Sequence, residues 1–348
     1  MTKTLGPRPD YEAIRAYRAP RSTAPIDLSS NTNQWGAAPS AMAALATCGE
    51  RDLREYPGTD ADDVVTAIAA YLGVAPANVL VGCGSDDLLD ASMRALGAPG
   101  DTVAHPDPTF AMAAAFARTN SLQPIAVPLA ANGAIDATAM LATNARIQYL
   151  CTPNNPTGTA TARADIERVI AEASGAVIID EAYAEFADDA FAADSPTYPN
   201  VLALRTFSKA FGLAGLRVGY AVGAPEMIET VRKARGPYRV SGPGERAATA
   251  ALTRDVAWVR SIANEVRTVR ARFADELRKL GFNSLPSHAN FVCVPTPNAR
   301  ALAERIAGQG IAVRAFPGLR DVGDALRITL APWPIMERVL GALREGVT

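Results

Sequence analysis

Apolar runs and helix-like periods alternate along the chain from about residue 60 to residue 235. Short continuous apolar runs predict strands, which lie at residues 78–81, 102–105, 124–127, 147–151, 176–180 and 201–205. Apolar residues that recur every three or four positions predict helices at residues 60–72, with Asp60 as the N-cap, and at 85–96, 109–118 and 162–173. Apolar strands that alternate with helices are typical of a mainly parallel sheet covered by helices on both faces.

The pattern changes after Arg235. Residues 236–244 form a link rich in glycine and proline, and a long helical stretch follows it. The apolar positions of this stretch recur every three or four residues, at Trp258, Ile262, Val266, Val269 and Phe273. The remaining chain predicts short strands at residues 290–294, 312–314 and 326–330 and helices near residues 299–307 and 335–344.

These two patterns predict an α/β protein with two domains. The large domain, residues 39–240, has a mainly parallel sheet sandwiched by helices, and a smaller α+β domain comprises residues 241–348. Residues 1–38 resemble neither unit, and we expect them to form an N-terminal arm or to complete the small domain. The 348 residues are ample for a sizeable buried core.

Composition and charge exclude several classes of protein. The 34 basic and 36 acidic side chains leave a net charge of -2, without the excess positive charge that nucleic-acid binding needs. No apolar run reaches the ~20 residues that span a bilayer, and the first residues lack the apolar core of a signal peptide. The four cysteines lie far apart and there are only two histidines, so neither a disulfide framework nor a metal site is predicted. We expect a cytoplasmic protein that binds neither nucleic acid nor membranes.

The strongest chemical signal is the segment 206–217, Thr-Phe-Ser-Lys-Ala-Phe-Gly-Leu-Ala-Gly-Leu-Arg. Lys209 follows a buried strand, where loss of water lowers the pKa of an amine and leaves it free to form a Schiff base. A lysine considered alone is more often a surface residue. Its neighbours favour the reactive interpretation, because Thr206 and Ser208 offer hydroxyls and Arg217 offers a guanidinium suited to phosphate.

Polar residues follow two other predicted strands. Asp180 ends the strand at 176–180, and its carboxylate could hold a protonated pyridine nitrogen, cap a helix or bind magnesium. Asn155, in Thr-Pro-Asn-Asn-Pro-Thr-Gly, could donate to a phenolic oxygen or belong to an ordinary Asn-Pro turn. Residue types alone leave these alternatives open.

The loop at residues 82–87 leads from a predicted strand into a helix. The backbone N–H groups of Gly84, Ser85 and Asp86 can point at an anion at this helix N-terminus. A plain helix start is the competing interpretation, which the Asp86 carboxylate favours slightly.

Four residues carry weaker signals. Phe110 could stack on a flat ring, although an aromatic residue after a strand is more often part of the core. Arg327 and Arg314 lie on predicted strands, where each could bind a carboxylate through two N–H groups or face solvent. Tyr56, in Glu-Tyr-Pro-Gly, gives the weakest indication of the four.

In chain order, these segments resemble the fold-type I pyridoxal-phosphate aminotransferases. The resemblance rests on residues 84–86, Phe110, Asn-Pro-Thr-Gly at 155–158, Asp180 with Tyr183, and Ser208-Lys209 with Arg217. The histidinol-phosphate aminotransferase branch of aminotransferase class II is the closer match, suggested by Leu-Ser-Ser-Asn at 28–31, Glu-Tyr-Pro at 55–57, Asp-Glu-Ala-Tyr at 180–183 and Leu-Ala-Gly-Leu-Arg at 213–217. It extends from about residue 26 to residue 330.

The resemblance implies a role for each residue. Lys209 would bind pyridoxal phosphate covalently and move a proton at the substrate's α-carbon, and Asp180 would keep the pyridine nitrogen protonated. Asn155 and Tyr183 would bind the phenolic oxygen, and Phe110 would stack on the ring. The cofactor phosphate would lie among Gly84, Ser85, the Asp86 backbone, Thr206, Ser208 and Arg217, with Tyr56 of a second subunit. Substrate would bind at Arg327, Arg314 and Asn33, and no metal is expected.

The implied enzyme is a homodimer with a shared active site that acts in histidine biosynthesis. It would transfer an amino group between a small amino substrate, L-histidinol phosphate being the leading choice, and the 2-oxo acid 2-oxoglutarate. Three positions depart from the usual pattern, with Thr32 in place of an acidic residue, Phe110 in place of tyrosine and Glu55 in place of arginine. Aromatic amino acids are therefore alternative substrates, and a decarboxylase of phosphothreonine type is an alternative enzyme.

A ligand-sensing regulator of aminotransferase shape is the alternative from a different class. Such regulators carry a helix-turn-helix ahead of this fold. Because the match begins near residue 26, we expect the enzyme instead.

Overall fold

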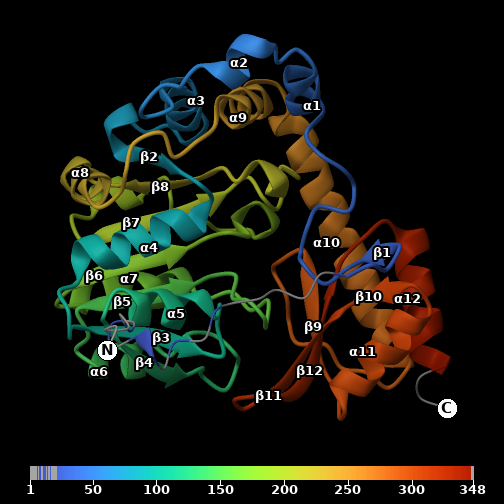
Figure 1. Cartoon of the computed structure of the whole chain (residues 1–348). Helices are drawn as coiled ribbons and strands as arrows, with labels where there is room; N and C mark the ends of the chain where they lie inside the picture. Colours follow the sequence, from blue (N-terminus) through green and yellow to red (C-terminus); the bar gives the residue numbers. More distant parts are fainter. Residues whose placement is uncertain are drawn as a thin grey trace, which may run out of the picture.

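The computed structural model of the chain describes residues 22–345 and, before them, residues 6, 8, 11, 12, 14 and 16. Part of the expected N-terminal arm, residues 1–38, therefore lies outside the described residues. Figure 1 shows a large sheet among helices, a smaller sheet beside it, and the long helix α10 running between the two regions. The predicted fold class, α/β with a mainly parallel sheet and a smaller α+β region, is confirmed. The domain boundaries stay a prediction.

Within the described residues, the large sheet has seven strands in the order β2-β8-β7-β6-β5-β3-β4. They are β2 (Val79–Gly82), β3 (Thr102–Asp107), β4 (Gln123–Pro128), β5 (Ile147–Cys151), β6 (Ala176–Asp180), β7 (Val201–Thr206) and β8 (Gly219–Gly223). Strand β8 runs antiparallel to β2 and β7, and the other strands share one direction. The sequence pattern misses β8, because this strand begins and ends with glycine and follows β7 without an intervening α-helix.

The α-helices are α1 (Pro39–Ala46), α2 (Glu50–Arg54), α3 (Asp62–Leu72), α4 (Ser85–Leu96), α5 (Met112–Thr119), α6 (Ala137–Ala142), α7 (Arg163–Glu172), α8 (Pro225–Lys233), α9 (Gly242–Arg254), α10 (Val256–Lys279), α11 (Ala299–Gly308) and α12 (Trp333–Glu345). Short 3₁₀ helices are η2 (Pro76–Asn78), η3 (Ala184–Phe186), η4 (Ser195–Thr197) and η5 (Ala214–Leu216). Among the described residues, no helix combines the length and the apolar character that crossing a membrane requires.

Both faces of the large sheet are covered, which explains why its inner strands β5, β6 and β7 are fully buried and mostly apolar. Helices α4, α5 and α8 share a core cluster with Ile178 of β6. Helices α6 and α7 share another cluster with Val177 and Ile179 of the same strand. Side chains alternate between the faces of a strand, so neighbouring residues enter different cores.

The helical stretch expected after residue 244 is two helices. Helices α9 and α10 meet at Asp255, whose carboxylate oxygens accept hydrogen bonds from Ser40 N and Ser40 Oγ, both at 2.7 Å. Ser40 belongs to the first turn of α1, which packs against α9 (Figure 1). A contact with a distant part of the chain therefore accompanies the break.

The predicted N-cap of α3 is wrong. The helix begins at Asp62, after Ala61 in a left-handed conformation with φ of 56°. The carboxylate of Asp60 pairs instead with the guanidinium of Arg232 on α8. Tertiary pairing has thus replaced a local cap.

The smaller sheet lies beside the carboxyl edge of the large one (Figure 1). Its strands β11 (Arg314–Leu319), β12 (Gly323–Thr329) and β9 (Phe291–Pro295) pair antiparallel in that order. Separately, β1 (Ile26–Asp27) pairs parallel with β10 (Ile311–Ala312). The single strand expected at 312–314 is therefore incorrect, because the chain leaves β10 and joins a different sheet at Arg314.

Candidate active site

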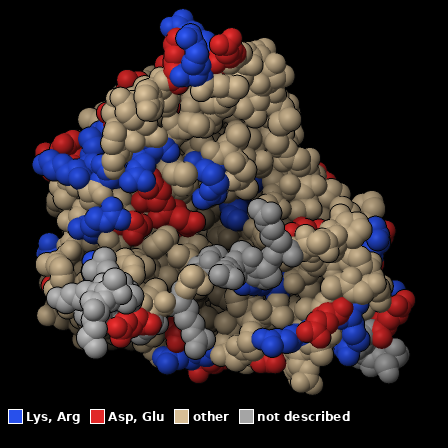
Figure 2. Space-filling model, in the orientation of Figure 1, with Lys and Arg blue, Asp and Glu red and all other residues tan. Residues whose placement is uncertain are grey.

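A cavity of about 450 Å³ opens between the large sheet and the smaller one. Figure 2 shows the hollow on this face, with basic side chains at its depth. The predicted site residues that line it are Ser85, Asp86, Phe110, Asn155, Asp180, Tyr183, Thr206, Ser208, Lys209, Arg217, Arg314 and Arg327. Most follow the carboxyl ends of strands that share one direction, and such ends meet at one edge of a sheet. The topology therefore brings distant loops together.

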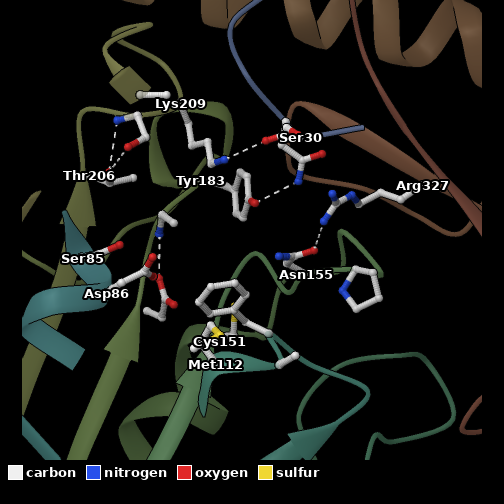
Figure 3. A pocket seen from close by; sticks show the side chains of 18 of the residues that line it. Ser30, Ser85, Asp86, Met112, Cys151, Asn155, Tyr183, Thr206, Lys209 and Arg327 are labelled. Atoms are coloured by element: carbon white, nitrogen blue, oxygen red, sulfur yellow. Dashed lines mark hydrogen bonds between the residues drawn. The ribbon is translucent and has the colours of Figure 1, made fainter. Parts of the chain in front are cut away.

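Lys209 lies in the loop after β7 and points into the cavity (Figure 3). Its Nζ donates to the carbonyl oxygen of Ser30 at 3.1 Å and lies 5.8 Å from the ring centroid of Tyr183. Loss of water around the ammonium, together with the nearby charge of Arg327, lowers the pKa of Lys209 to about 8. A substantial fraction of this amine is therefore neutral near physiological pH.

Asp180 ends β6 and is buried at the floor of the cavity. Its Oδ2 accepts from the Tyr149 hydroxyl at 2.7 Å, and its Oδ1 accepts from Ala182 N at 3.2 Å. Burial raises the pKa of Asp180 to about 6, and these two hydrogen bonds oppose the rise. The group is mostly charged at neutral pH and is suited to hold a cationic ring nitrogen.

Asn155 meets the smaller sheet through Arg327. The Nη1 of Arg327 donates to Asn155 Oδ1, and its Nη2 donates to the carbonyl oxygen of Ser29 at 2.6 Å. Because the amide oxygen binds Arg327, the Nδ2 hydrogens are the ones left to donate elsewhere. Figure 3 shows Asn155 and Arg327 facing each other across the cavity from Lys209.

Tyr183 is buried and accepts a hydrogen bond from Asn31 Nδ2 at 2.9 Å. Burial raises the pKa of its phenol to about 12, so the hydroxyl keeps its proton. Since the oxygen accepts from Asn31, that proton can be donated elsewhere in the cavity. Asn31 in turn binds Thr329 of β12 through its backbone N and its Oδ1. Tyr183 is thus fixed from the smaller sheet.

Asn33, the expected substrate ligand, is not among the residues that line the cavity. Its Nδ2 donates to Ala210 O and its Oδ1 accepts from Trp35 N, both at 2.9 Å. Asn31, two residues earlier, lines the cavity in its place. The motif at residues 28–31 contained this asparagine, but its role was not predicted.

The start of α4 forms a cradle for an anion. Gly84 has φ of +81°, and a Cβ added there would lie 2.5 Å from Nη2 of Arg217. The twelve-residue helix begins at Ser85, and its N-terminal N–H groups carry the positive end of the helix dipole. Thr206 Oγ1 donates to Ser208 Oγ at 2.9 Å beside it. These donors fit a phosphate group.

Asp86 is the negative group at this cradle. Its Oδ2 lies 3.8 Å from Arg217 Nη2. Burial raises the pKa of Asp86, and the charges of Arg217 and Lys209 oppose the rise. Its backbone N–H, rather than its carboxylate, is therefore the group suited to a phosphate.

Tyr56 is outside this cavity. Its side chain is 84% exposed and stacks on Tyr238 with ring centroids 4.9 Å apart. Neither ring lines the pocket of its own chain.

Several lining residues were not predicted. They are Ser29, Ser30, Asn31, Thr32, Thr109, Ala111, Met112, Cys151, Pro156, Ala182, Ala214 and Phe316. Alternation of side chains along a strand could have found Phe316, which lies two residues from Arg314 on β11 and so on the same face. Cys151 ends β5 where Asp180 ends β6, and the two pair in register. Among the described residues, no group of three or more His, Cys, Asp or Glu side chains is placed to hold a metal ion.

A reactive amine, a buried carboxylate and a phosphate cradle around one cavity define a fold-type I enzyme of pyridoxal phosphate. Residues 23–341 match the family described as aminotransferase class I and II, and the chain belongs to this family. It is a pyridoxal-phosphate-dependent aminotransferase. The Gly84 cradle, Asp180 and Lys209 fit the three parts of that cofactor.

Two similar proteins are named for the same activity. The chain is 32% identical over 346 residues to histidinol-phosphate aminotransferase 1 of Trichormus variabilis, covering 97% of this chain and 98% of the relative. It is 29% identical to the histidinol-phosphate aminotransferase of Sinorhizobium meliloti, solved in complex with pyridoxal-5'-phosphate, with a TM-score of 0.83 and coverage of 92% and 90%.

A second solved structure is named for a different activity. L-threonine-O-3-phosphate decarboxylase from Porphyromonas gingivalis has a TM-score of 0.83 at 22% identity, covering 92% of this chain and 99% of that one. At this identity the likeness concerns the fold alone. Backbone shape therefore does not separate transamination from decarboxylation.

Proposed function

We propose that this aminotransferase transfers the amino group of L-histidinol phosphate to 2-oxoglutarate, a step of histidine biosynthesis. The observation that carries the proposal is the pair of arginines on the smaller sheet. Arg314 and Arg327 are register partners on β11 and β12, and both line the cavity across from Asp180. Guanidinium groups bind phosphate and carboxylate through paired N–H donors, so one site serves both anionic substrates.

The relatives support the choice of amino substrate. The Trichormus variabilis and Sinorhizobium meliloti proteins are both named histidinol-phosphate aminotransferase, and each match covers 90% or more of both chains. The cavity of about 450 Å³ lies within the size range of small-molecule sites.

We assign the catalytic roles as follows. Bound pyridoxal phosphate supplies a ring that accepts the electron pair left when the substrate's α-carbon loses its proton. Lys209 Nζ would bind the cofactor, and once the amino substrate has displaced it, the free amine would take the proton from the substrate's α-carbon and deliver it to C4′ of the cofactor. Asp180 holds a proton on the ring nitrogen, and Tyr183 and Asn155 bind the phenolic oxygen. Phe110 covers the ring.

The cofactor phosphate is assigned to the cradle at the start of α4. Its donors are the N–H groups of Ser85 and Asp86, the hydroxyls of Ser85, Thr206 and Ser208, and the guanidinium of Arg217. Gly84, which has no side chain, leaves space for the phosphate beside Arg217. Tyr56 completes the cradle of a second subunit in a cytoplasmic homodimer. Its 84% exposure leaves the phenol accessible to such a partner.

The test is a set of half-reactions with purified holoenzyme. L-histidinol phosphate, phenylalanine, tyrosine and phosphothreonine are each added without an oxo acid, and the visible band of the bound cofactor is followed. We expect L-histidinol phosphate to remove the band fastest and to yield its ketone. Reaction with phenylalanine and tyrosine alone would contradict the substrate assignment, and release of carbon dioxide from phosphothreonine would favour the decarboxylase.

A further inference from the structure

Tyr149 lies beneath the cavity and is not among the residues that line it. It is a residue of β5, its side chain is 0% exposed, and it belongs to the core cluster of α4, α5 and α8. In register it pairs with Ile178 of β6, so Asp180 lies two residues further along the neighbouring strand and on the same face. No motif in the sequence singles out this tyrosine.

The hydroxyl of Tyr149 makes a short hydrogen bond to the carboxylate. It donates to Asp180 Oδ2 at 2.7 Å, while Ala182 N donates to Oδ1 at 3.2 Å. Each carboxylate oxygen thus has a protein donor, which fixes the plane of the group. The lone pairs that remain on these oxygens are the ones available to a ligand in the cavity.

The direction of this hydrogen bond is fixed by its surroundings. Burial and the charge of Asp180 raise the pKa of Tyr149 far above its ordinary value, so its proton stays on the phenol. The other ionisable groups that act on Asp180, or that its charge acts on, are Cys151 of β5, Asp86 of α4, Glu181 beside it, Tyr183 and Lys209. Among the described ionisable side chains near Asp180, Tyr149 is the one that donates a hydrogen bond to its carboxylate.

We propose that Tyr149 is a positioning residue for transamination: its hydroxyl orients the Asp180 carboxylate and keeps it charged, so that the proton stays on the ring nitrogen of the cofactor. The inference rests on the role proposed above for Asp180. A hydrogen bond donated to a carboxylate stabilises its charged form. Without it, Asp180 becomes a stronger base and draws the proton from the ring nitrogen, so the ring accepts electrons less well.

The test variant is Tyr149→Phe, which keeps the aromatic ring in the core and removes only the hydroxyl. The first readout is nitrogen NMR of holoenzyme carrying pyridoxal phosphate labelled at its ring nitrogen, with no amino substrate. We expect the chemical shift of the ring nitrogen to move from the value of the protonated ring toward that of the neutral ring. We also expect the Kd for pyridoxal phosphate to rise and kcat to fall about tenfold, with KM unchanged within about twofold.

Two controls separate this role from a loss of packing. Tyr220→Phe removes the hydroxyl of another fully buried tyrosine, on β8, which does not line the cavity, and should leave the nitrogen signal unchanged. In an Asp180→Asn background, Tyr149→Phe should have no further effect on the signal or on kcat, because the two groups act as one unit.

Each outcome bears on a separate statement. If Tyr149→Phe leaves the nitrogen signal in place while Asp180→Asn moves it, the Tyr149 inference is overturned and the role of Asp180 stands. If Asp180→Asn also leaves the signal in place, the proposed role of Asp180 fails first. The identity of the amino substrate does not enter this spectrum.

Discussion

The two sides of the cavity are built in different ways. On the large sheet, short continuous stretches supply the functional groups, such as residues 206–209 after β7. On the opposite side, segments from the two ends of the chain meet: Arg327 donates to Ser29 O and Thr329 donates to Asn31, each across 298 positions. Local motifs thus specify the side that we assign to the cofactor, whereas long-range packing specifies the side that we assign to substrate.

Lys209→Ala breaks the cofactor side most completely. We expect turnover to fall by at least ~10³-fold, because the variant lacks the amine that takes the α-proton. The visible band of covalently bound pyridoxal phosphate should also disappear. Lys233→Ala, at an exposed lysine of α8, is the matched control and should keep both. A coloured, active Lys209→Ala enzyme would show that another group binds the cofactor.

Asp180→Ala should have the next largest effect. We expect kcat to fall by roughly 10²–10³-fold, since a preorganised charge at the ring nitrogen is lost. The free energy of unfolding should change by only about 1–3 kcal/mol, the cost of leaving the Tyr149 hydroxyl without its acceptor. Steady-state kinetics and denaturant unfolding measure the two effects. Near-native turnover would contradict the assignment.

Arg327→Gln tests the substrate side. We expect KM for both substrates to rise about tenfold to a hundredfold, because a charge-assisted contact with an anionic group is lost. Absorbance of the bound cofactor should be retained. An unchanged KM would place the anionic group of the substrate elsewhere.

The pH dependence of the same variant tests whether the two sides of the cavity interact electrostatically. Only the neutral amine of Lys209 captures pyridoxal phosphate, so the capture rate of wild-type apoenzyme should rise with pH through about 8. Arg327 lowers the pKa of Lys209, so Arg327→Gln should move the midpoint to higher pH. Stopped-flow absorbance over a pH series measures the shift. Coincident midpoints would show that the two sides are electrostatically independent.

Asn31→Ala should have the smallest effect. We expect kcat to fall about fivefold, because Tyr183 loses one hydrogen bond that orients it. Asn33→Ala, two residues away and outside the cavity, is the control for kcat and KM. Equal losses in the two variants would mean that Asn31 acts through general loop stability.

Most of the large sheet could be predicted because its inner strands are buried on both faces and form continuous apolar runs in the sequence. The ends of those strands could be assigned to one site, since strands of common direction end at one edge. Strand β8 could not be predicted, because Gly219–Gly223 is short and bounded by glycines, and its place in the sheet depends on pairing with β2 and β7. The break at Asp255 likewise coincides with a contact to Ser40, 215 positions away.

The substrate side was predicted less completely for a related reason. Asn31 and Asn33 are the same residue type two positions apart, and the backbone decides which one faces the cavity. Asn31 has φ of 54°, a left-handed conformation stabilised by contacts with Thr329 and Asn290. No local pattern encodes that conformation, because its partners lie near the other end of the chain.

The β1–β10 pair gives the enzyme a practical modularity. It attaches residues 29–32 to the region that carries Arg314 and Arg327, whereas Lys209 and Asp180 belong to loops and strands of the large sheet. Protein engineers can therefore randomise the loop after β1 together with β11 and leave every large-sheet loop untouched. A library built on that division, with Asn31 held constant because it orients Tyr183, would search for new amino donors while the large-sheet loops assigned to vitamin B6 stay unchanged.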